Sequence, residues 1–199
     1  MLNIIIFGAP GSGKGTHSDL MKKKHSLTHI STGDVLRQEI KNETELGLIA
    51  KGYMDKGQLV PDDLICDMLD KVLDTLMDSK GVIFDGFPRT IPQAETLEKI
   101  LNKRGMDVSI LLDLQVEDEE LVKRLLERGR LSGRSDDNEE TIQSRLKVYH
   151  SQTAPLAEHY KRKGKHVAIK GNGTIEEIFS RIDKAIKQLT MVGLKTEKK

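Results

Sequence analysis

A glycine-rich segment near the start of the chain, residues 8–16, constrains the fold more than any other part of the sequence. It reads Gly-Ala-Pro-Gly-Ser-Gly-Lys-Gly-Thr and follows an apolar run over residues 2–7, which only Asn3 interrupts. The residues after it have helical character, so the sequence predicts a buried strand, a tight turn and a helix in succession. In such a turn, backbone N–H groups and the helix dipole converge on an anion, and Lys14 adds a positive charge. The segment therefore predicts a phosphate-binding loop.

The loop departs from the common phosphate-loop pattern at one position. Gly8, Gly13 and Lys14 fit G-x-x-x-x-G-K, but Gly15 stands where a hydroxyl residue is expected and Thr16 follows one position later. A glycine-rich surface turn is the alternative interpretation. The strand before the loop and the helix after it favour the phosphate site.

The overall charge excludes a general attraction to nucleic acid. Lys and Arg number 32 against 31 Asp and Glu, so the formal net charge is +1. An anion site in this chain must therefore come from a local cluster of cations. At 199 residues the chain has the length of one domain with a substantial core, with room for small inserted subdomains.

Cys66 is the sole cysteine, so it excludes an internal disulfide framework and cannot build a zinc site. Apolar neighbours predict a buried core thiol rather than a nucleophile. No apolar run approaches the length of a membrane span, and no basic region precedes the first apolar stretch. We therefore expect a cytoplasmic protein.

Helical segments alternate with short apolar runs along the whole chain. The expected strands are residues 2–7, 28–30, 82–84, 108–114 and 167–169. This alternation predicts an α/β fold with a parallel sheet that helices cover on both faces. Ligands of such folds bind beyond the carboxyl ends of the strands, so the residues that follow each strand deserve most scrutiny.

The residues after the second strand predict a small helical insertion. Ser31 and Asp34 fit a variant capping box, which explains them without any ligand, and Arg37 lies one turn further along the same helix. Thr44 predicts the N-cap of another short helix, and Pro61 opens the next. We expect residues 31–60 to form a mobile subdomain between two strands.

The third strand ends at Asp85, which resembles the acidic partner of a phosphate loop that holds magnesium or its waters. A buried aspartate that merely caps a turn is the alternative. Arg89 follows closely, and a guanidinium there would grip phosphate with two hydrogen bonds. Gln93 lies three residues beyond Thr90, so a capping box also accounts for it.

Arginines surround a short polar segment, residues 129–137, that has the composition of a flap. Arg124 and Arg128 precede it on one helix face, Arg134 lies within it, and Arg145 follows on the next helix. A solvated charged face explains Lys123 or Arg130 but explains this cluster poorly. Pro155 is expected to kink or split the helix that follows.

Taken together, these motifs resemble the adenylate kinases, in the nucleoside monophosphate kinase family, with the short form of the lid. The resemblance covers about residues 1–190 and includes the lysine-glycine-threonine ending of the loop. Gly15 is usual in that family, whereas His17 stands where glutamine is usual.

The resemblance implies a P-loop NTPase-type fold of three layers around a five-stranded parallel sheet. It implies that Mg-ATP and AMP react reversibly to give two ADP. It implies one kinase domain, with a core of about residues 1–30, 61–128 and 138–190, an AMP-binding insertion of about 31–60 and a lid of about 129–137. A polar tail would follow over residues 191–199, frayed from Gly193.

The resemblance also implies the site residues. Those for ATP are Gly11, Ser12, Gly13, Lys14, Gly15, Thr16, Arg124 and Gly173. Those for AMP are Thr32, Gly33, Arg37, Met54, Gln58, Leu59, Val60, Gly86, Arg89, Gln93, Arg134 and Arg145. Those for catalysis are Lys14, Arg89, Arg128, Arg134 and Arg145, with Asp136 and Asp137.

Magnesium is expected near Thr16 and Asp85, held through phosphates and water, and no zinc is expected. Thr32 and Gln93 have the form that relatives use for adenine rather than for a pyrimidine. A pyrimidine monophosphate kinase and a nucleotide-binding switch are the alternative functions. The switch would lack a second arginine-rich site, and the chain has no Asn-Lys-x-Asp guanine reader. The expected partners are ATP, AMP and ADP, with no nucleic acid or membrane, and the chain is expected to be a monomer.

Overall fold

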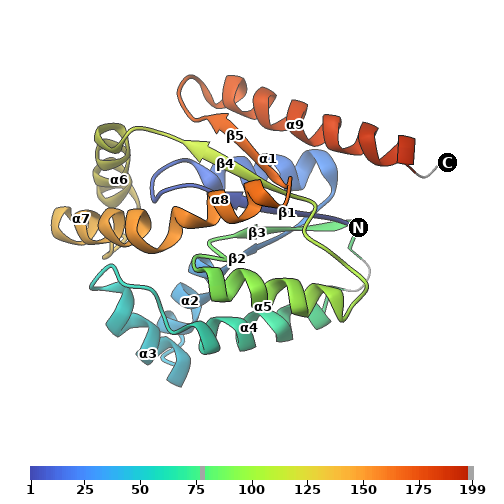
Figure 1. The fold of residues 1–199 in the computed structure, drawn as a ribbon. Coiled ribbons are helices and arrows are strands. Elements are labelled where there is room, and N and C mark those ends of the chain that lie inside the picture. Colours follow the sequence, from blue (N-terminus) through green and yellow to red (C-terminus); the bar gives the residue numbers. More distant parts are fainter. Residues whose placement is uncertain (77–78, 197–199) are drawn as a thin grey trace.

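The computed structural model describes residues 1–76 and 79–196 and shows an α/β fold around one parallel sheet (Figure 1). The strands are β1 (Leu2–Phe7), β2 (Thr28–Ser31), β3 (Gly81–Asp85), β4 (Ile110–Gln115) and β5 (His166–Lys170). The sheet has five strands in the order β2-β3-β1-β4-β5, and every pairing is parallel. The predicted fold class is therefore confirmed, and the strand before the glycine-rich loop lies at the centre of the sheet.

Helices connect the strands and cover both faces of the sheet (Figure 1). They are α1 (Lys14–His25), α2 (Thr32–Lys41), α3 (Glu45–Met54), α4 (Asp62–Asp74), α5 (Ile91–Asn102), α6 (Asp118–Ser132), α7 (Glu139–Val148), the π-helical turn η1 (Tyr149–Thr153), α8 (Pro155–Arg162) and α9 (Ile175–Thr196). Figure 1 shows α3 and α7 on the same side of the molecule, away from both termini. Hydrogen bonds from Thr141 and Ser144 of α7 to the Asp55 and Lys56 carbonyls show that the expected insertion contacts the helix that follows the expected lid.

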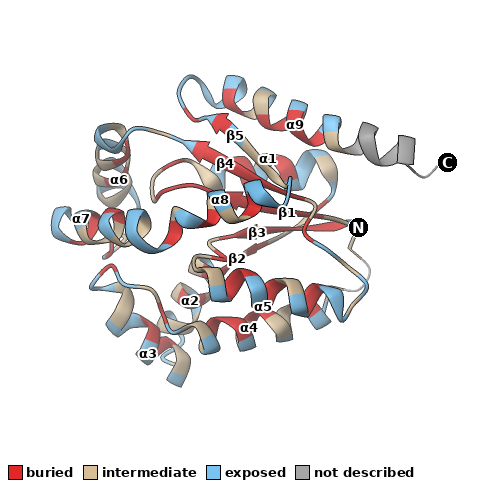
Figure 2. Cartoon of the chain, viewed as in Figure 1, coloured by how far each residue is buried: buried red, intermediate tan, exposed pale blue. Residues whose placement is uncertain are grey.

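The side chains of β1 alternate between two hydrophobic cores, and Figure 2 shows the central strands coloured as buried. Ile5 and Phe7 pack in the core that α4, α5 and α8 cover, whereas Ile4 and Ile6 pack in the core that α1 and α9 cover. Successive strand residues point to opposite faces, so a strand buried on both sides needs a continuous apolar run. This requirement explains the composition of residues 2–7.

Side-chain caps begin several helices as the sequence predicts. Thr44 accepts a hydrogen bond from the Gly47 N–H, as expected of an N-cap. A further cap, at the start of α9, is the reciprocal capping box of Thr174 and Glu177. Ser31 caps α2 through the Asp34 N–H, at 3.3 Å. These caps satisfy N–H groups that would otherwise lack partners in the first helical turn.

The predicted break near Pro155 is confirmed. Between α7 and α8 the chain widens into η1, where the Ala154 N–H donates to the Tyr149 carbonyl at 2.8 Å. Proline has no N–H and its ring displaces the carbonyl four residues earlier, so the preceding turn takes the wider π geometry.

Three elements differ from the sequence prediction by two residues or more at one end, and the limits of the lid and tail as units stay predictions. Strand β4 begins two residues later than expected, because the Val108 N–H binds the Asp107 side chain instead of a neighbouring strand. Helix α6 continues to Ser132, so the first four residues of the expected lid, 129–132, are helical and Gly133 ends the helix in the left-handed conformation. Helix α9 continues past Gly193, because one glycine costs only about 1 kcal/mol within a helix. The end of the expected tail, residues 197–199, lies outside the described residues.

Candidate active site

Left-handed glycines shape the loop at the carboxyl end of β1. Gly8, Gly11 and Gly13 have φ angles of 139°, 85° and 96°. A Cβ atom at Gly8 would lie 2.6 Å from the Leu114 carbonyl oxygen, so the loop also packs too closely on β4 for a side chain. Glycine is therefore required at all three positions for conformation, and at Gly8 also for space.

The Lys14 ammonium folds back over this loop. Its Nζ donates to the Gly8 carbonyl at 2.7 Å and to the Ala9 carbonyl at 2.9 Å. Loss of hydration lowers the pKa of Lys14 to about 8, and the charge of Asp85 opposes that shift only in part. The loop thus holds a cation that has few waters around it and would gain from an anionic ligand.

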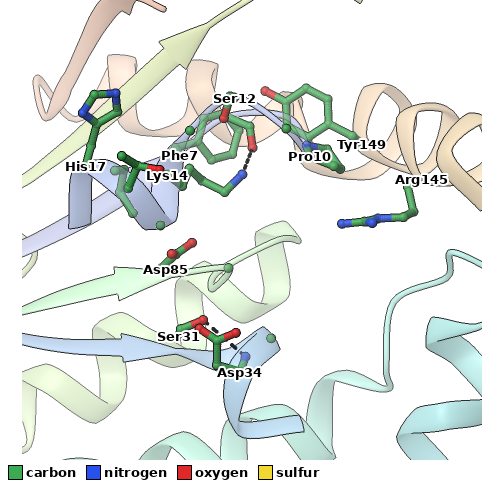
Figure 3. A pocket seen from close by; sticks show the side chains of 18 of the residues that line it. Phe7, Pro10, Ser12, Lys14, His17, Ser31, Asp34, Asp85, Arg145 and Tyr149 are labelled. Atoms are coloured by element: carbon green, nitrogen blue, oxygen red, sulfur yellow. Dashed lines mark hydrogen bonds between the residues drawn. The ribbon is translucent and has the colours of Figure 1, made fainter. Parts of the chain in front are cut away.

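A cleft of about 760 Å³ opens beside the loop (Figure 3). Figure 3 shows Lys14, Asp85 and Arg145 pointing into it from different elements. The residues expected for ATP all line this cleft: Gly11, Ser12, Gly13, Lys14, Gly15, Thr16, Arg124 and Gly173. Arg124 also donates to the Gly171 carbonyl at 3.3 Å, so it lies beside the loop that contains Gly173.

A smaller cavity of about 70 Å³ adjoins the cleft beneath α2 and α3. Its walls contain nearly every residue expected for AMP: Thr32, Gly33, Arg37, Met54, Gln58, Leu59, Val60, Gly86, Arg89, Gln93 and Arg145. The remaining one, Arg134, lines the large cleft. The structure therefore brings the two predicted nucleotide sites together, and Arg89 and Arg145 border both spaces.

Hydrogen bonds to the backbone position the side chains of the smaller cavity. Thr32 Oγ1 and Arg89 Nε both donate to the Gly86 carbonyl, at 2.9 and 2.8 Å. The Arg89 N–H donates to Gln93 Oε1 at 2.7 Å, so Gln93 does not complete the reciprocal capping box with Thr90. Burial, and then the charge of Arg145, lower the pKa of Arg89 to about 10, which leaves the guanidinium charged at neutral pH.

Two carboxylates hold the arginines that flank residues 129–137. Asp137 accepts two hydrogen bonds from Arg128, at 2.6 and 2.8 Å, and one from Arg145 at 2.7 Å. Asp136 lies 3.0 Å from Arg145 and lines the smaller cavity. Asp137 lines neither space and is 4% exposed. Burial opposes its ionisation, but the hydrogen bonds and charges of Arg128 and Arg145 prevail and keep its pKa below the usual value.

Asp34 connects the expected insertion, residues 31–60, with the expected lid, residues 129–137. Its Oδ1 accepts a hydrogen bond from Arg37 and lies 3.6 Å from Arg134 Nη2. The local sequence around Asp34 predicts only a capping residue and gives no sign of this contact. Because Arg134 is about a hundred residues away in the chain, no local pattern could reveal it.

Two further residues line the cleft without belonging to any site motif named in the sequence. His29 has its Nε2 atom 3.3 Å from Asp85 Oδ2. Tyr149 lines the cleft from η1 and packs on Phe7 with ring centroids 5.8 Å apart. His17, the departure from the family pattern, is buried beside Gly13, and burial lowers its pKa.

The donor set suits a magnesium ion held chiefly by phosphate oxygens and water. Thr16 and Asp85 line the cleft near Lys14. Asp85 is 8% exposed and offers one carboxylate. Within residues 1–76 and 79–196 no three His, Cys, Asp or Glu side chains gather as a metal site. Mg²⁺ usually keeps several waters and binds through one or two carboxylates plus substrate phosphates, so this arrangement fits it. None of the helices in the described part of the chain is long and apolar enough to cross a membrane.

Comparison with known proteins gives a consistent result over almost the whole chain. Residues 6–165 match the family described as adenylate kinase. A protein of Parabacteroides distasonis named adenylate kinase is 72% identical over 186 residues, which cover 94% of this chain and 98% of that protein. Proteins of the same name from Bacteroides fragilis and Porphyromonas gingivalis are 62% and 57% identical, over 95% and 92% of this chain and 100% and 94% of their own lengths.

Proposed function

This chain belongs to the adenylate kinase family, and we propose that its cleft holds ATP and AMP together and transfers the γ-phosphoryl group between them. The reaction would give two ADP and run in both directions. As a member of this family the chain is an ATP:AMP phosphotransferase. We propose below which residues perform this transfer and how magnesium and closure of the cleft contribute to it.

The observation that carries the proposal is the continuity of the two spaces. The phosphate loop borders the large cleft, the expected AMP residues border the adjoining cavity, and Arg89 and Arg145 border both. A nucleotide-binding switch has no need of a second anion site next to the first. A phosphotransferase needs two such sites in contact.

Charge neutralisation is the main task of the protein in this mechanism. The two nucleotides bring several negative charges together, and Lys14, Arg89, Arg128, Arg134 and Arg145 would offset their repulsion. No general base is required, because the attacking oxygen of the AMP phosphate is already anionic. Positioning and electrostatic stabilisation supply most of the rate of phosphoryl transfer.

Asp85 and Thr16 would hold magnesium, mostly through water, beside the phosphates of ATP. When bound, the ion would neutralise charge on the β- and γ-phosphate oxygens. The loop residues Gly11, Ser12, Gly13 and Gly15 would bind phosphate through their backbone, and Arg124 and Gly173 would lie near the adenine of ATP.

Closure of two segments over the nucleotides completes the proposal. We expect residues 31–60, which bring Arg37 to the AMP phosphate, and residues 129–137, which bring Arg134, to move relative to the core. The contact between Asp34 and Arg134 supports this, because it joins the two segments across the cleft. A closed cleft would exclude water, which otherwise competes for the phosphoryl group.

We further propose a monomeric cytoplasmic enzyme that serves purine nucleotide salvage and energy homeostasis. The single cysteine is consistent with a reducing compartment, and the near balance of charges is consistent with small-molecule substrates.

A panel of nucleoside monophosphates tests the function directly. The purified protein is mixed with Mg-ATP and AMP, UMP, CMP or GMP, and ADP formation is followed, with EDTA as the magnesium control. We expect rapid turnover with AMP only, and none with EDTA. Turnover with UMP or CMP would instead indicate a pyrimidine monophosphate kinase, and binding of ATP without transfer would indicate a switch.

A further inference from the structure

We propose that Asp62 is a positioning residue that fixes the Gln93 amide, so that the AMP cavity accepts a 6-aminopurine and rejects a 6-oxopurine. Asp62 belongs to the first turn of α4, immediately after the segment expected to move. Nothing in its sequence context indicates this role, because an acidic residue in the first turn of a helix is sufficiently explained by the helix dipole.

The contacts of Asp62 link it to α5. Its Oδ1 accepts a hydrogen bond from Gln93 Nε2 at 2.6 Å, and its Oδ2 accepts one from Thr90 Oγ1 at 2.9 Å. Both oxygens of one carboxylate are thus bound to the segment that begins α5. Gln93 is 2% exposed and lines the AMP cavity. Solvent water therefore cannot replace the hydrogen bonds that its amide would lose by turning over.

A carboxylate fixes the orientation of this amide because it can only accept hydrogen bonds. The NH₂ group of Gln93 must therefore face Asp62, and its oxygen must face the Arg89 N–H, which donates at 2.7 Å. Reversal of the amide would place oxygen against carboxylate and NH₂ against N–H. Each would be a repulsive contact in a buried position.

The fixed amide offers the base one free hydrogen-bond acceptor and one free donor in a defined arrangement. The described contacts use one of the two N–H groups of Gln93 and one of the two lone pairs of its oxygen. The remaining acceptor matches the 6-amino group of adenine, and the remaining donor matches the adjacent ring nitrogen. A 6-oxopurine presents the opposite pattern, an acceptor at position 6 and an N–H beside it, so it would need the reversed amide.

This inference rests on the proposed function, because it takes the smaller cavity as the AMP site. AMP and IMP are the appropriate pair of probes, since they differ only in the groups that the Gln93 amide would contact. Two measurements are made on each protein: the ratio of kcat/KM for AMP to that for IMP with Mg-ATP, and the Kd of each monophosphate by calorimetry.

Asp62→Asn is the principal variant, because the new amide offers either an acceptor or a donor to Gln93. We expect the AMP-to-IMP ratio to fall about tenfold, and not to unity, because the Arg89 N–H still favours one orientation. The KM for ATP should not change. Asp62→Ala is the second variant and should lower the ratio in the same way if Asp62→Asn does not fold.

Asp63→Asn is the matched control. Asp63 is the exposed neighbour in the same helical turn, so this variant makes the same change of charge without touching Gln93. The ratio should stay at the wild-type value. An equal fall in both variants would assign the effect to charge alone and overturn the proposal.

An unchanged ratio in the Asp62 variants would also overturn the proposal, as would a wild-type protein that uses IMP as well as AMP. In the second case phosphoryl transfer itself would stand, so the two failures are distinguishable. If the wild-type protein transferred nothing to AMP, the proposed function would fail, and the calorimetric ratio would still decide the role of Asp62.

Discussion

The two sides of the cleft hold positive charge by different means. On the phosphate-loop side the partners are backbone groups: the loop N–H groups converge by conformation, and Lys14 rests on the Gly8 and Ala9 carbonyls. On the arginine side the partners are carboxylates, with Asp34 between Arg37 and Arg134 and Asp137 between Arg128 and Arg145. The first arrangement is fixed by the core, whereas the second depends on exchangeable ion pairs.

This difference explains how one cleft can have a preformed phosphate site and still close over its ligands. The backbone partners Gly8 and Ala9 follow directly on the central strand β1, so they are in place before any ligand binds. Carboxylate partners neutralise arginines that would otherwise repel one another, and they can release those arginines to phosphate. The following predictions test that distinction, from the largest expected effect to the smallest.

Arg89 is expected to give the largest effect, because in the described part of the chain it has no ion pair with a carboxylate. Its guanidinium is held by the Gly86 carbonyl and borders both spaces. Arg89→Ala should reduce kcat by about 10³–10⁵, the range known for arginines that neutralise a transferring phosphoryl group. Steady-state ADP formation measures this.

Arg130→Ala is the matched control, since Arg130 is an exposed arginine near the end of α6. It should have nearly wild-type kcat, and both variants should keep the wild-type unfolding temperature. A near-normal kcat for Arg89→Ala would reject the assigned role and would make the two sides of the cleft equivalent.

Asp137→Asn tests the arginine side of the cleft through its effect on the stability of the protein. It removes the partner of Arg128 and Arg145, and the loss of one member of a buried ion pair costs about 3 kcal/mol. The free energy of unfolding in urea should fall by that order. Asp136→Asn is the comparison, and its effect should be smaller because Arg145 also binds the Asp136 backbone carbonyl.

The difference in stability between the wild-type protein and Asp137→Asn should depend on pH. Because the folded-state pKa of Asp137 is lowered, its contribution to stability is complete above the unfolded-state value of about 3.9 and is lost as pH falls through the folded value. The stability difference between wild type and Asp137→Asn should therefore shrink below about pH 4. A difference that stayed constant down to pH 2.5 would contradict the ionised pair.

Proton uptake by Lys14 when ATP binds tests the phosphate-loop side of the cleft. Because its pKa in the free cleft is about 8, the ammonium loses its proton above that pH, and ATP must restore it on binding. ATP affinity should fall by up to about tenfold per pH unit above pH 8. Calorimetry at pH 8.7 in two buffers of different ionisation enthalpy should detect net proton uptake, and an absence of uptake would show that the backbone carbonyls keep Lys14 charged.

Asp34→Asn should give the smallest effect, in the opposite direction. Asp34 competes with the AMP phosphate for Arg37 and Arg134, so its neutralisation should tighten AMP binding about two- to threefold, as befits a largely exposed ion pair. Calorimetric titration with AMP at low and high salt measures this, with the difference lost at high salt. Weaker binding would mean that Asp34 orients the arginines instead.

The sequence predicts most of the architecture because its local signals are strong. The apolar run before the phosphate loop, the alternation of strands and helices, and Pro155 each specify their own structure through neighbouring residues. These signals are sufficient to predict the sheet, its parallel pairing and the break before α8. Boundaries such as the end of α6 were wrong because glycine within a helix and glycine after it look alike in sequence.

The partners of the site side chains could not be predicted in the same way. Asp34 and Asp62 both satisfy local rules for helix beginnings, and those rules conceal their contacts with Arg134 and Gln93. A side chain that a cap or a dipole already explains gives no second signal. Only the tertiary structure shows which carboxylate holds which cation.

The place of β1 at the centre of the sheet also has a consequence for biosynthesis. Its neighbours are β3 and β4, with Leu2 opposite Gly81 and Ile4 opposite Ile110. Of the strands in this sheet β1 is synthesised first, yet one of its edges stays unpaired until β3 has been made and the other until β4 has been made. The phosphate loop that follows β1 therefore acquires its native surroundings well after its own synthesis, and contacts of such long range are the ones that slow folding.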